Sequence, residues 1–172
     1  MAARESPVVD AFALASGRGA IHGELPLSCL TRLSDMLLDT AGVLTYAIQG
    51  RIDDQGHPGV TMHLSADLML ACQRCNSPVT FRLDRTAVFR FAASDDELAS
   101  RPIEDDEFED IVASRHLEIA PWVEDEAILS LPVVPRHESC GPASSPHEQV
   151  RGEPDQRPFA VLAGFRPSRR VN

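Results

Sequence analysis

The chain has 172 residues, of which 43% are hydrophobic, so a single domain can bury a core of its own without disulfide bonds. It contains 16 Arg and no Lys against 26 acidic residues, and the net charge of −10 argues against general binding to nucleic-acid backbones. No apolar run approaches the ~20 residues of a membrane span, and Glu5 and Asp10 interrupt the stretch where a secretory signal would lie, so we expect a cytoplasmic protein.

The first predicted element is a helix over residues 29–39. Ser28 stands at the N-cap position, Leu30, Leu33 and Leu37 recur at helical spacing, and Gly42 follows the end. From Leu44 the hydrophobic period changes to two residues, with apolar side chains at positions 44, 46, 48 and 52. This pattern predicts a strand over 44–52, with a bulge at Gly50.

The clearest alternation covers residues 60–72, where every second residue is apolar. It resumes over 79–91 after a short polar link, with Arg82, Asp84 and Arg90 expected to face water and Arg85 as the exception to the pattern. Two alternating runs joined in this way predict a hairpin. Together with the preceding strand they form an antiparallel meander that has one wet face.

A second amphipathic helix is predicted over residues 119–129, because Ile119, Trp122, Val123, Glu126, Ile128 and Leu129 fit one face and Pro132 and Pro135 follow. We therefore expect an α+β fold over residues 1–140, an antiparallel β meander packed with two amphipathic helices and an acidic loop. A flexible Pro-rich linker over 141–158 leads to an apolar and Arg-rich motif over 159–172. That motif either folds back over the core or orders on a partner.

The excess negative charge is concentrated in the middle of the chain. Residues 95–135 hold two Arg and thirteen acidic residues, whereas residues 1–94 hold eight Arg and nine acids. The block is either a solvated loop kept open by repulsion or a docking strip for a basic partner. The protein-docking candidates are the acids of this block and two apolar tail residues: Glu104, Asp105, Asp106, Glu107, Glu109, Asp110, Phe159 and Leu162.

Four cysteines occur, and two of them lie in a C-x-x-C motif at the predicted hairpin turn, Cys72 and Cys75. This spacing matches half of a tetrahedral zinc site, and His137 with Cys140 supplies a possible second half. A closed site with these four ligands would be structural. The alternatives are reduced, metal-free thiols or, less compatibly with a turn that follows a strand, a redox pair.

Three motifs in this order resemble the YceD family: LACQRC at residues 70–75, the run from Val123 to Pro135 with His137 after it, and RPFAVL at 157–162. That family is associated with accumulation of large-subunit ribosomal RNA in bacteria, and its gene commonly neighbours that of a large-subunit ribosomal protein. The resemblance therefore implies ribosome biogenesis. In some relatives a second Cys-rich cluster looks like the other half of a zinc site, and here His137 and Cys140 stand in that region.

The sequence favours a binding module over an enzyme. It contains no H-E-x-x-H, G-x-S-x-G or P-loop motif, and without Lys it can form no Schiff base. The expected role is a non-catalytic factor supporting synthesis, processing or stability of large-subunit (23S) rRNA; the alternative is a zinc-dependent hydrolase or nuclease acting on RNA. Its partner would be rRNA or a precursor particle, or else a basic ribosomal protein held by the acidic block. The RNA-binding candidates are Arg51, Arg74, Arg82 and Arg90.

Overall fold

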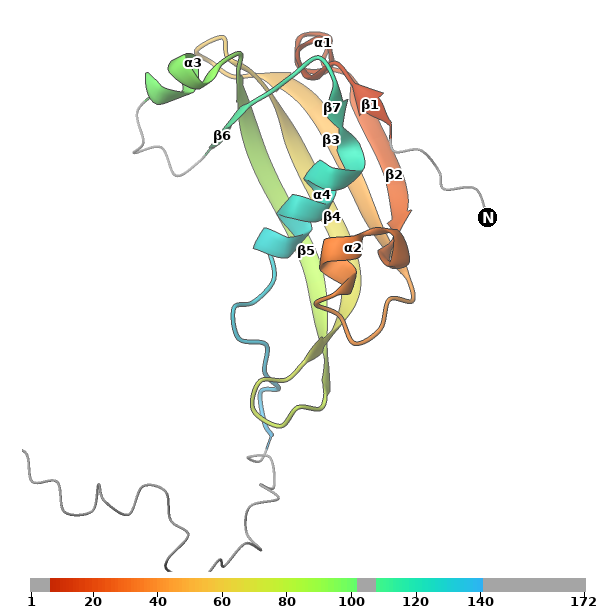
Figure 1. Cartoon of the computed structure of the whole chain (residues 1–172). Coiled ribbons are helices and arrows are strands. Elements are labelled where there is room, and N and C mark those ends of the chain that lie inside the picture. The colour runs from red at the N-terminus through yellow and green to blue at the C-terminus, as the bar shows by residue number, and fades with distance from the viewer. Residues whose placement is uncertain (1–6, 102–107, 141–172) are drawn as a thin grey trace, which may run out of the picture.

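A computed structural model describes residues 7–101 and 108–140, and its centre is a five-stranded sheet covered on one face by helices (Figure 1). The order of the strands is β2-β3-β4-β5-β6, antiparallel except for the β5–β6 pair. The mixed α+β class and the antiparallel meander are confirmed. The strands of this sheet are β2 (Ala20–Pro26), β3 (Val43–Ile52), β4 (Pro58–Ala71), β5 (Pro78–Ala92) and β6 (Glu109–Val112).

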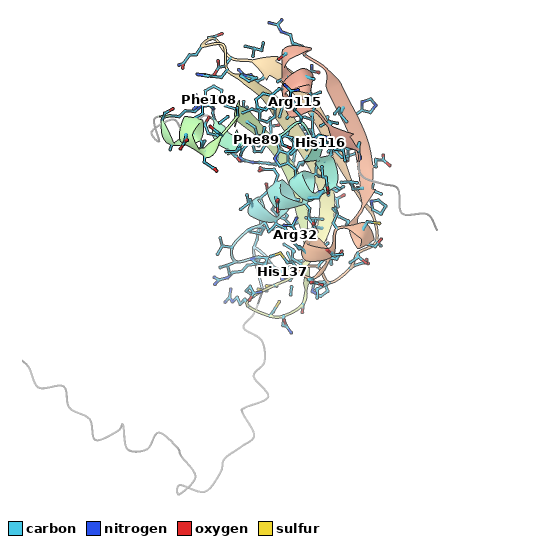
Figure 2. The ribbon with its side chains drawn as sticks, turned by 45° about the horizontal axis from the view of Figure 1, so that its top comes forward. Arg32, Phe89, Phe108, Arg115, His116 and His137 are labelled. Carbon is cyan, nitrogen blue, oxygen red and sulfur yellow. The ribbon has the colours of Figure 1, made fainter. Side chains whose placement is uncertain are left out.

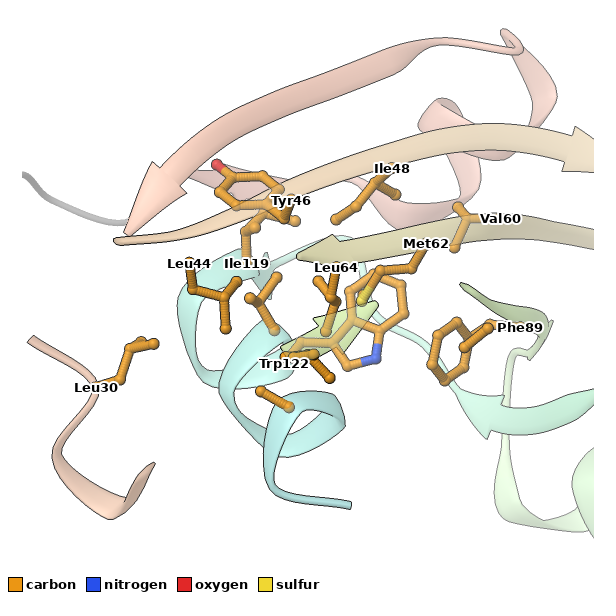
Figure 3. Packing of buried hydrophobic residues seen from close by; sticks show 14 of the residues in the cluster. Leu30, Leu44, Tyr46, Ile48, Val60, Met62, Leu64, Phe89, Ile119 and Trp122 are labelled. Carbon is orange, nitrogen blue, oxygen red and sulfur yellow. The ribbon is translucent and has the colours of Figure 1, made fainter. Parts of the chain in front are cut away.

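The apolar alternation of β3, β4 and β5 builds the inner face of the sheet. Tyr46 pairs with Leu64 and Leu68 with Phe81, so apolar side chains from neighbouring strands meet on one side. Helix α4 (Ile119–Leu129) packs on this face, with the Trp122 ring 4.9 Å from that of Phe89 in an edge-to-face arrangement (Figure 3). Burial of this cluster is the main force that stabilises the domain.

Helix α4 has the bounds predicted for it, and the chain leaves it before Pro132. Its buried residues include Ile119, Trp122 and Val123, as the pattern required. Leu129, however, is 77% exposed, so its placement on the apolar face was wrong. Glu126 does face inward and is buried, because it meets a guanidinium from β5.

The predicted helix over 29–39 is wrong in extent. The segment forms a 3-10 turn, η1 (Leu27–Cys29), and a single helical turn, α2 (Thr31–Ser34), with no side-chain cap from Ser28. The chain then turns toward the sheet, where the Leu38 N–H donates to the Met69 carbonyl. A periodic run of leucines was thus divided between a short helix and a loop held against β4.

The short helix α2 is stabilised from outside. Its first backbone N–H groups, those of Arg32 and Leu33, donate to the buried carboxylate of Glu124 on α4, at 2.8 and 3.1 Å. The Arg32 side chain also pairs with Glu124 and with the exposed Asp125. Glu124 therefore caps a helix whose bonded residues lie 91 and 92 positions away in the sequence, a role usually taken by a residue next to the helix.

We predict that Glu124→Ala lowers the free energy of unfolding by about 2–3 kcal/mol, because it leaves one buried and one part-buried N–H donor and one guanidinium without their acceptor. Chemical denaturation measures the change. The matched control is Asp125→Ala, which removes only an exposed ion pair to the same arginine and should cost less than about 1 kcal/mol. Equal losses in the two variants would contradict the capping role.

Three elements of the N-terminal region were not predicted: β1 (Val8–Val9), α1 (Ala11–Ser16) and β2 (Ala20–Pro26). Strand β2 extends the meander, and helix α1, capped by the Asp10 carboxylate, packs on β3 and β4. A small second sheet pairs β1 with β7 (Leu117–Glu118). Gly50 forms no bulge: it pairs regularly with Val60, and a Cβ there would overlap the backbone of α1.

The described part of the acidic block is ordered rather than a loop. Ser94 caps α3 (Asp95–Ala99), whose first turn carries three acidic residues, a favourable arrangement at a helix N-terminus. Strand β6 then pairs in parallel with β5 through Glu109 and Asp110. Glu104, Asp105, Asp106 and Glu107 lie outside the described residues, as do the predicted linker and the tail. Within the described ranges, no helix is long and apolar enough to cross a membrane.

Candidate functional site

The β4–β5 hairpin places Cys72 and Cys75 at one end of the sheet. The turn is closed by two backbone bonds, from Asn76 N–H to the Cys72 carbonyl and from Cys72 N–H to the Ser77 carbonyl. Asn76 takes a left-handed conformation (φ 58°), which Asn tolerates better than most residues. The tight turn brings the two thiols of the C-x-x-C motif to the same side of the hairpin.

The segment after α4 brings the second half of the cluster to this turn, and it runs beside the hairpin in Figure 1. The Gln73 N–H donates to the Pro135 carbonyl at 2.9 Å, which holds the segment against the turn. His137 then lies beside Cys75, with its Nδ1 3.5 Å from that Sγ, and the Sγ atoms of Cys140 and Cys72 are 3.8 Å apart.

These distances fit one tetrahedral ion. The four ligand atoms of Cys72, Cys75, His137 and Cys140 all lie within 4.8 Å of one another. Zinc bonds of about 2.3 Å to sulfur and 2.0 Å to nitrogen give tetrahedral edges of about 3.8 Å between sulfurs and 3.5 Å between sulfur and nitrogen. The structure brings together the four predicted residues and is compatible with a bound metal.

Hydrogen bonds around the cluster favour the thiolate forms of Cys72 and Cys75 and orient the ring of His137. Burial disfavours the Cys72 thiolate, but backbone N–H groups of Arg74, Cys75 and His137 outweigh that effect and lower its pKa to about 5. The Ser77 backbone N–H likewise lowers the pKa of Cys75. The His137 Nε2 lies 2.9 Å from the Pro78 carbonyl; donation there leaves Nδ1 as the ligand atom. The other two ligands differ: the bond to the Pro78 carbonyl raises the pKa of His137, and burial raises the pKa of Cys140. Zinc, which binds thiolate and neutral imidazole, would therefore have to compete with protons at these two side chains.

The predicted RNA-binding arginines do not form one free surface. Arg90, expected to face water, is 6% exposed, because β6 covers it and Asp110 accepts bonds from its Nε and a terminal nitrogen. The guanidiniums of Arg90 and Arg51 also lie 4.5 and 5.6 Å from the Phe108 ring centre. Figure 2 places Phe108 and His137 at opposite ends of the sheet.

The other two candidates are exposed. Arg82 stands opposite Asp67 on the outer face of the sheet, and Arg74 lies at the hairpin turn. Neither takes part in any ion pair among the residues that the structure describes. Of the four candidates, Arg82 on β5 and Arg74 in the hairpin turn are thus available to a partner, and they lie on different parts of the surface.

Arg85, the exception to the alternation, faces inward and joins two carboxylates. It lies 2.9 Å from Glu126 and 2.7 Å from Glu109. The two carboxylates share one guanidinium, and burial together with the nearby Glu126 charge raises the pKa of Glu109. These residues line a hollow of about 490 Å³ that Leu129 borders. The sequence showed only that Arg85 broke the pattern.

The described docking candidates are already engaged. Glu109 pairs with Arg85, and Asp110 pairs with Arg90 and Arg101. Asp95 and Asp96 of α3 are exposed and belong to no ion pair within the described residues. Within the described residues, α3 therefore carries two adjacent acids of the block that are available to a partner, and it precedes Glu104 in the sequence.

Comparison with known proteins identifies relatives. The family model described as "Large ribosomal RNA subunit accumulation protein YceD" matches residues 60–166. A protein of the same name from Haemophilus influenzae is 31% identical over 148 residues, which cover 80% of this chain and 82% of that protein. No solved structure was found to match the chain.

Proposed function

We propose that this chain, which belongs to the YceD family, is a non-catalytic factor that supports the accumulation of large-subunit (23S) rRNA. The family match includes the hairpin, the cysteine cluster and α4. Support can act on the synthesis, processing or stability of the rRNA. This role extends to the chain the function that its relative's name states.

We infer that the Cys3His cluster holds zinc in a structural role. Four protein side chains converge at tetrahedral spacing, so they fill the coordination shell of one zinc ion. Catalytic zinc sites keep one position open for water, and a closed site does not. This geometry supports a scaffold that joins the hairpin to the segment after α4, and it disfavours the alternative of a zinc-dependent hydrolase or nuclease.

The observation that favours a protein partner is the pairing of the arginines. Arg85, Arg90 and Arg101 are engaged with acidic residues, whereas Asp95 and Asp96 remain exposed. Affinity for an RNA backbone depends on cations that can replace counterions, and the chain as a whole is acidic. We therefore propose that the acidic surface at α3, continued by Glu104–Glu107, binds a basic protein of the large subunit.

Affinity purification of the tagged full chain from growing cells tests this partner. We expect a basic ribosomal protein to be retained at low salt after RNase treatment and to be lost at high salt, because exposed charges are screened. Asp95→Arg with Asp96→Arg should weaken retention. The control is Glu24→Arg, an exposed acid on β2 far from α3 in the sequence, which should have no such effect.

Retention of rRNA alone, sensitive to RNase and to Arg82→Glu, would instead support direct RNA binding. Retention that is equal in the α3 variant and the Glu24 control would contradict the acidic docking surface. The family role would still stand in either case, since it concerns rRNA accumulation and not the identity of the contact.

A further inference from the structure

A second surface, distinct from the metal cluster and α3, is exposed and apolar. We call it the apolar strap: residues 129–135, which run from the last residue of α4 to the proline bonded by Gln73. Val133 is 98% exposed and Leu129 77% exposed, and Val134 is also exposed. Exposed side chains of this size in one short segment are unusual on a soluble domain and commonly indicate a binding surface.

Three hollows lie along the strap and share lining residues. One of about 280 Å³ lies between the strap and Met36, and one of about 230 Å³ lies on the other side, with Phe81. Both are bordered by Pro132 and Pro135. Phe81 also lines the 490 Å³ hollow that contains Arg85 and Leu129. The hollows therefore form one continuous surface around the strap.

The strap is held at both ends, so its surface is formed before anything binds. At its start, the Ser130 N–H donates to the Glu126 carbonyl; at its end, the Pro135 carbonyl accepts from Gln73. Its lining is apolar around Val133 and becomes charged toward the 490 Å³ hollow. There, Glu109 and Glu126 share Arg85, so two carboxylates face one guanidinium among the residues that the structure describes.

The C-terminal segment of the same chain has the matching composition. Phe159, Val161, Leu162 and Phe165 supply apolar side chains, and residues 157–172 contain four Arg and no acidic residue. The described chain ends at Cys140, five residues after the strap. The intervening residues 141–158 can span up to about 60 Å when extended, so the segment can reach every part of the strap.

We propose that the 159–165 segment binds the apolar strap of its own chain. Its apolar side chains occupy the hollows beside Val133, and the flanking Arg157 and Arg166 lie toward Glu109 and Glu126. The linker makes the contact intramolecular, with an effective concentration in the millimolar range, so that even a weak contact is largely formed. This inference concerns the isolated chain and does not depend on the proposed ribosomal partner.

Photo-crosslinking in the full-length protein tests the contact. Val133 is replaced by benzoylphenylalanine, which its exposure allows without disturbing the core, and crosslinked peptides are identified by mass spectrometry. We expect crosslinks within one chain to residues 157–166. The control places the same group at Ile52, the exposed last residue of β3. It should give no such crosslink. Phe159→Ser with Leu162→Ser should abolish the crosslink, while circular dichroism remains unchanged.

Three results would overturn the proposal. Crosslinks that join two copies and give a dimer would assign the strap to a second molecule. The absence of any tail crosslink at Val133 would show that the tail does not bind the strap. Equal yields at Val133 and Ile52, or yields unchanged by the double serine variant, would show only random encounters of the tail with the surface.

Discussion

Cys75→Ser is expected to abolish zinc binding and to lower the free energy of unfolding by on the order of 3 kcal/mol, the stabilisation that a ligand gives at some hundred times its dissociation constant. The reason is that the proposed zinc ion would join two segments 62 or more residues apart, the hairpin and the residues after α4. Elemental analysis after zinc-supplemented expression and chemical denaturation measure the two effects. His137→Ala should behave in the same way.

The chain provides a matched control for the zinc prediction. Cys29 is exposed and lies outside the cluster, so Cys29→Ser should keep one zinc per chain and the wild-type stability. A strong chelator should destabilise the wild-type protein and leave Cys75→Ser unaffected. Only trace zinc in the supplemented wild-type protein, or an equal zinc content in all three proteins, would contradict the site.

Arg90→Glu is expected to destabilise the fold by about 3–5 kcal/mol, the usual loss when one member of a buried ion pair is removed. The Arg90 and Asp110 side chains are 7% and 17% exposed, and Asp110 also pairs with Arg101. Reversal of the charge would put two carboxylates together and would loosen β6. Urea denaturation measures the loss.

Arg82→Glu is the control for that reversal. It lies on the same strand and the same outer side but is exposed, so its effect should remain within about 0.5 kcal/mol. Similar stabilities of the two variants would contradict the buried network. Because an RNA-binding defect in Arg90→Glu would reflect unfolding, Arg82→Glu is the variant suited to test the wet face.

Local patterns predicted the elements whose partners are neighbours in sequence. The long alternating runs gave β4, β5 and their hairpin, since a period of two over a dozen residues fits only a half-buried strand. The apolar positions that include Trp122 and Val123 recur with the period of a helix, and this pattern predicted α4. Each of these segments carries its own signal.

The features that sequence patterns missed depend on contacts between distant residues. Arg90 follows the alternation of β5, but β6 covers it, and a four-residue strand in an acidic run carries almost no strand signal. The helical leucine spacing over 29–39 was overridden by the bond from Leu38 to Met69. Gly50 suggested a bulge. In the structure, a glycine is needed there because the backbone of α1 comes too close for a side chain, and no local pattern indicates this contact.

For the cysteine cluster, the spacing predicted the ligands but not their surroundings. C-x-x-C and H-x-x-C each indicated half a site, and the structure brings the halves together. The contact between His137 and the Pro78 carbonyl and the bond between Gln73 and Pro135 are tertiary contacts. They orient the ligands, and no sequence pattern indicated them.

The ratio of large-subunit to small-subunit rRNA in cells depleted of this protein tests the central claim most directly. We expect depletion to lower the ratio and the wild-type chain to restore it. Cys75→Ser should restore it poorly and Cys29→Ser fully, with matched protein levels verified by immunoblotting. An unchanged ratio in depleted cells would contradict a role in the accumulation of large-subunit rRNA.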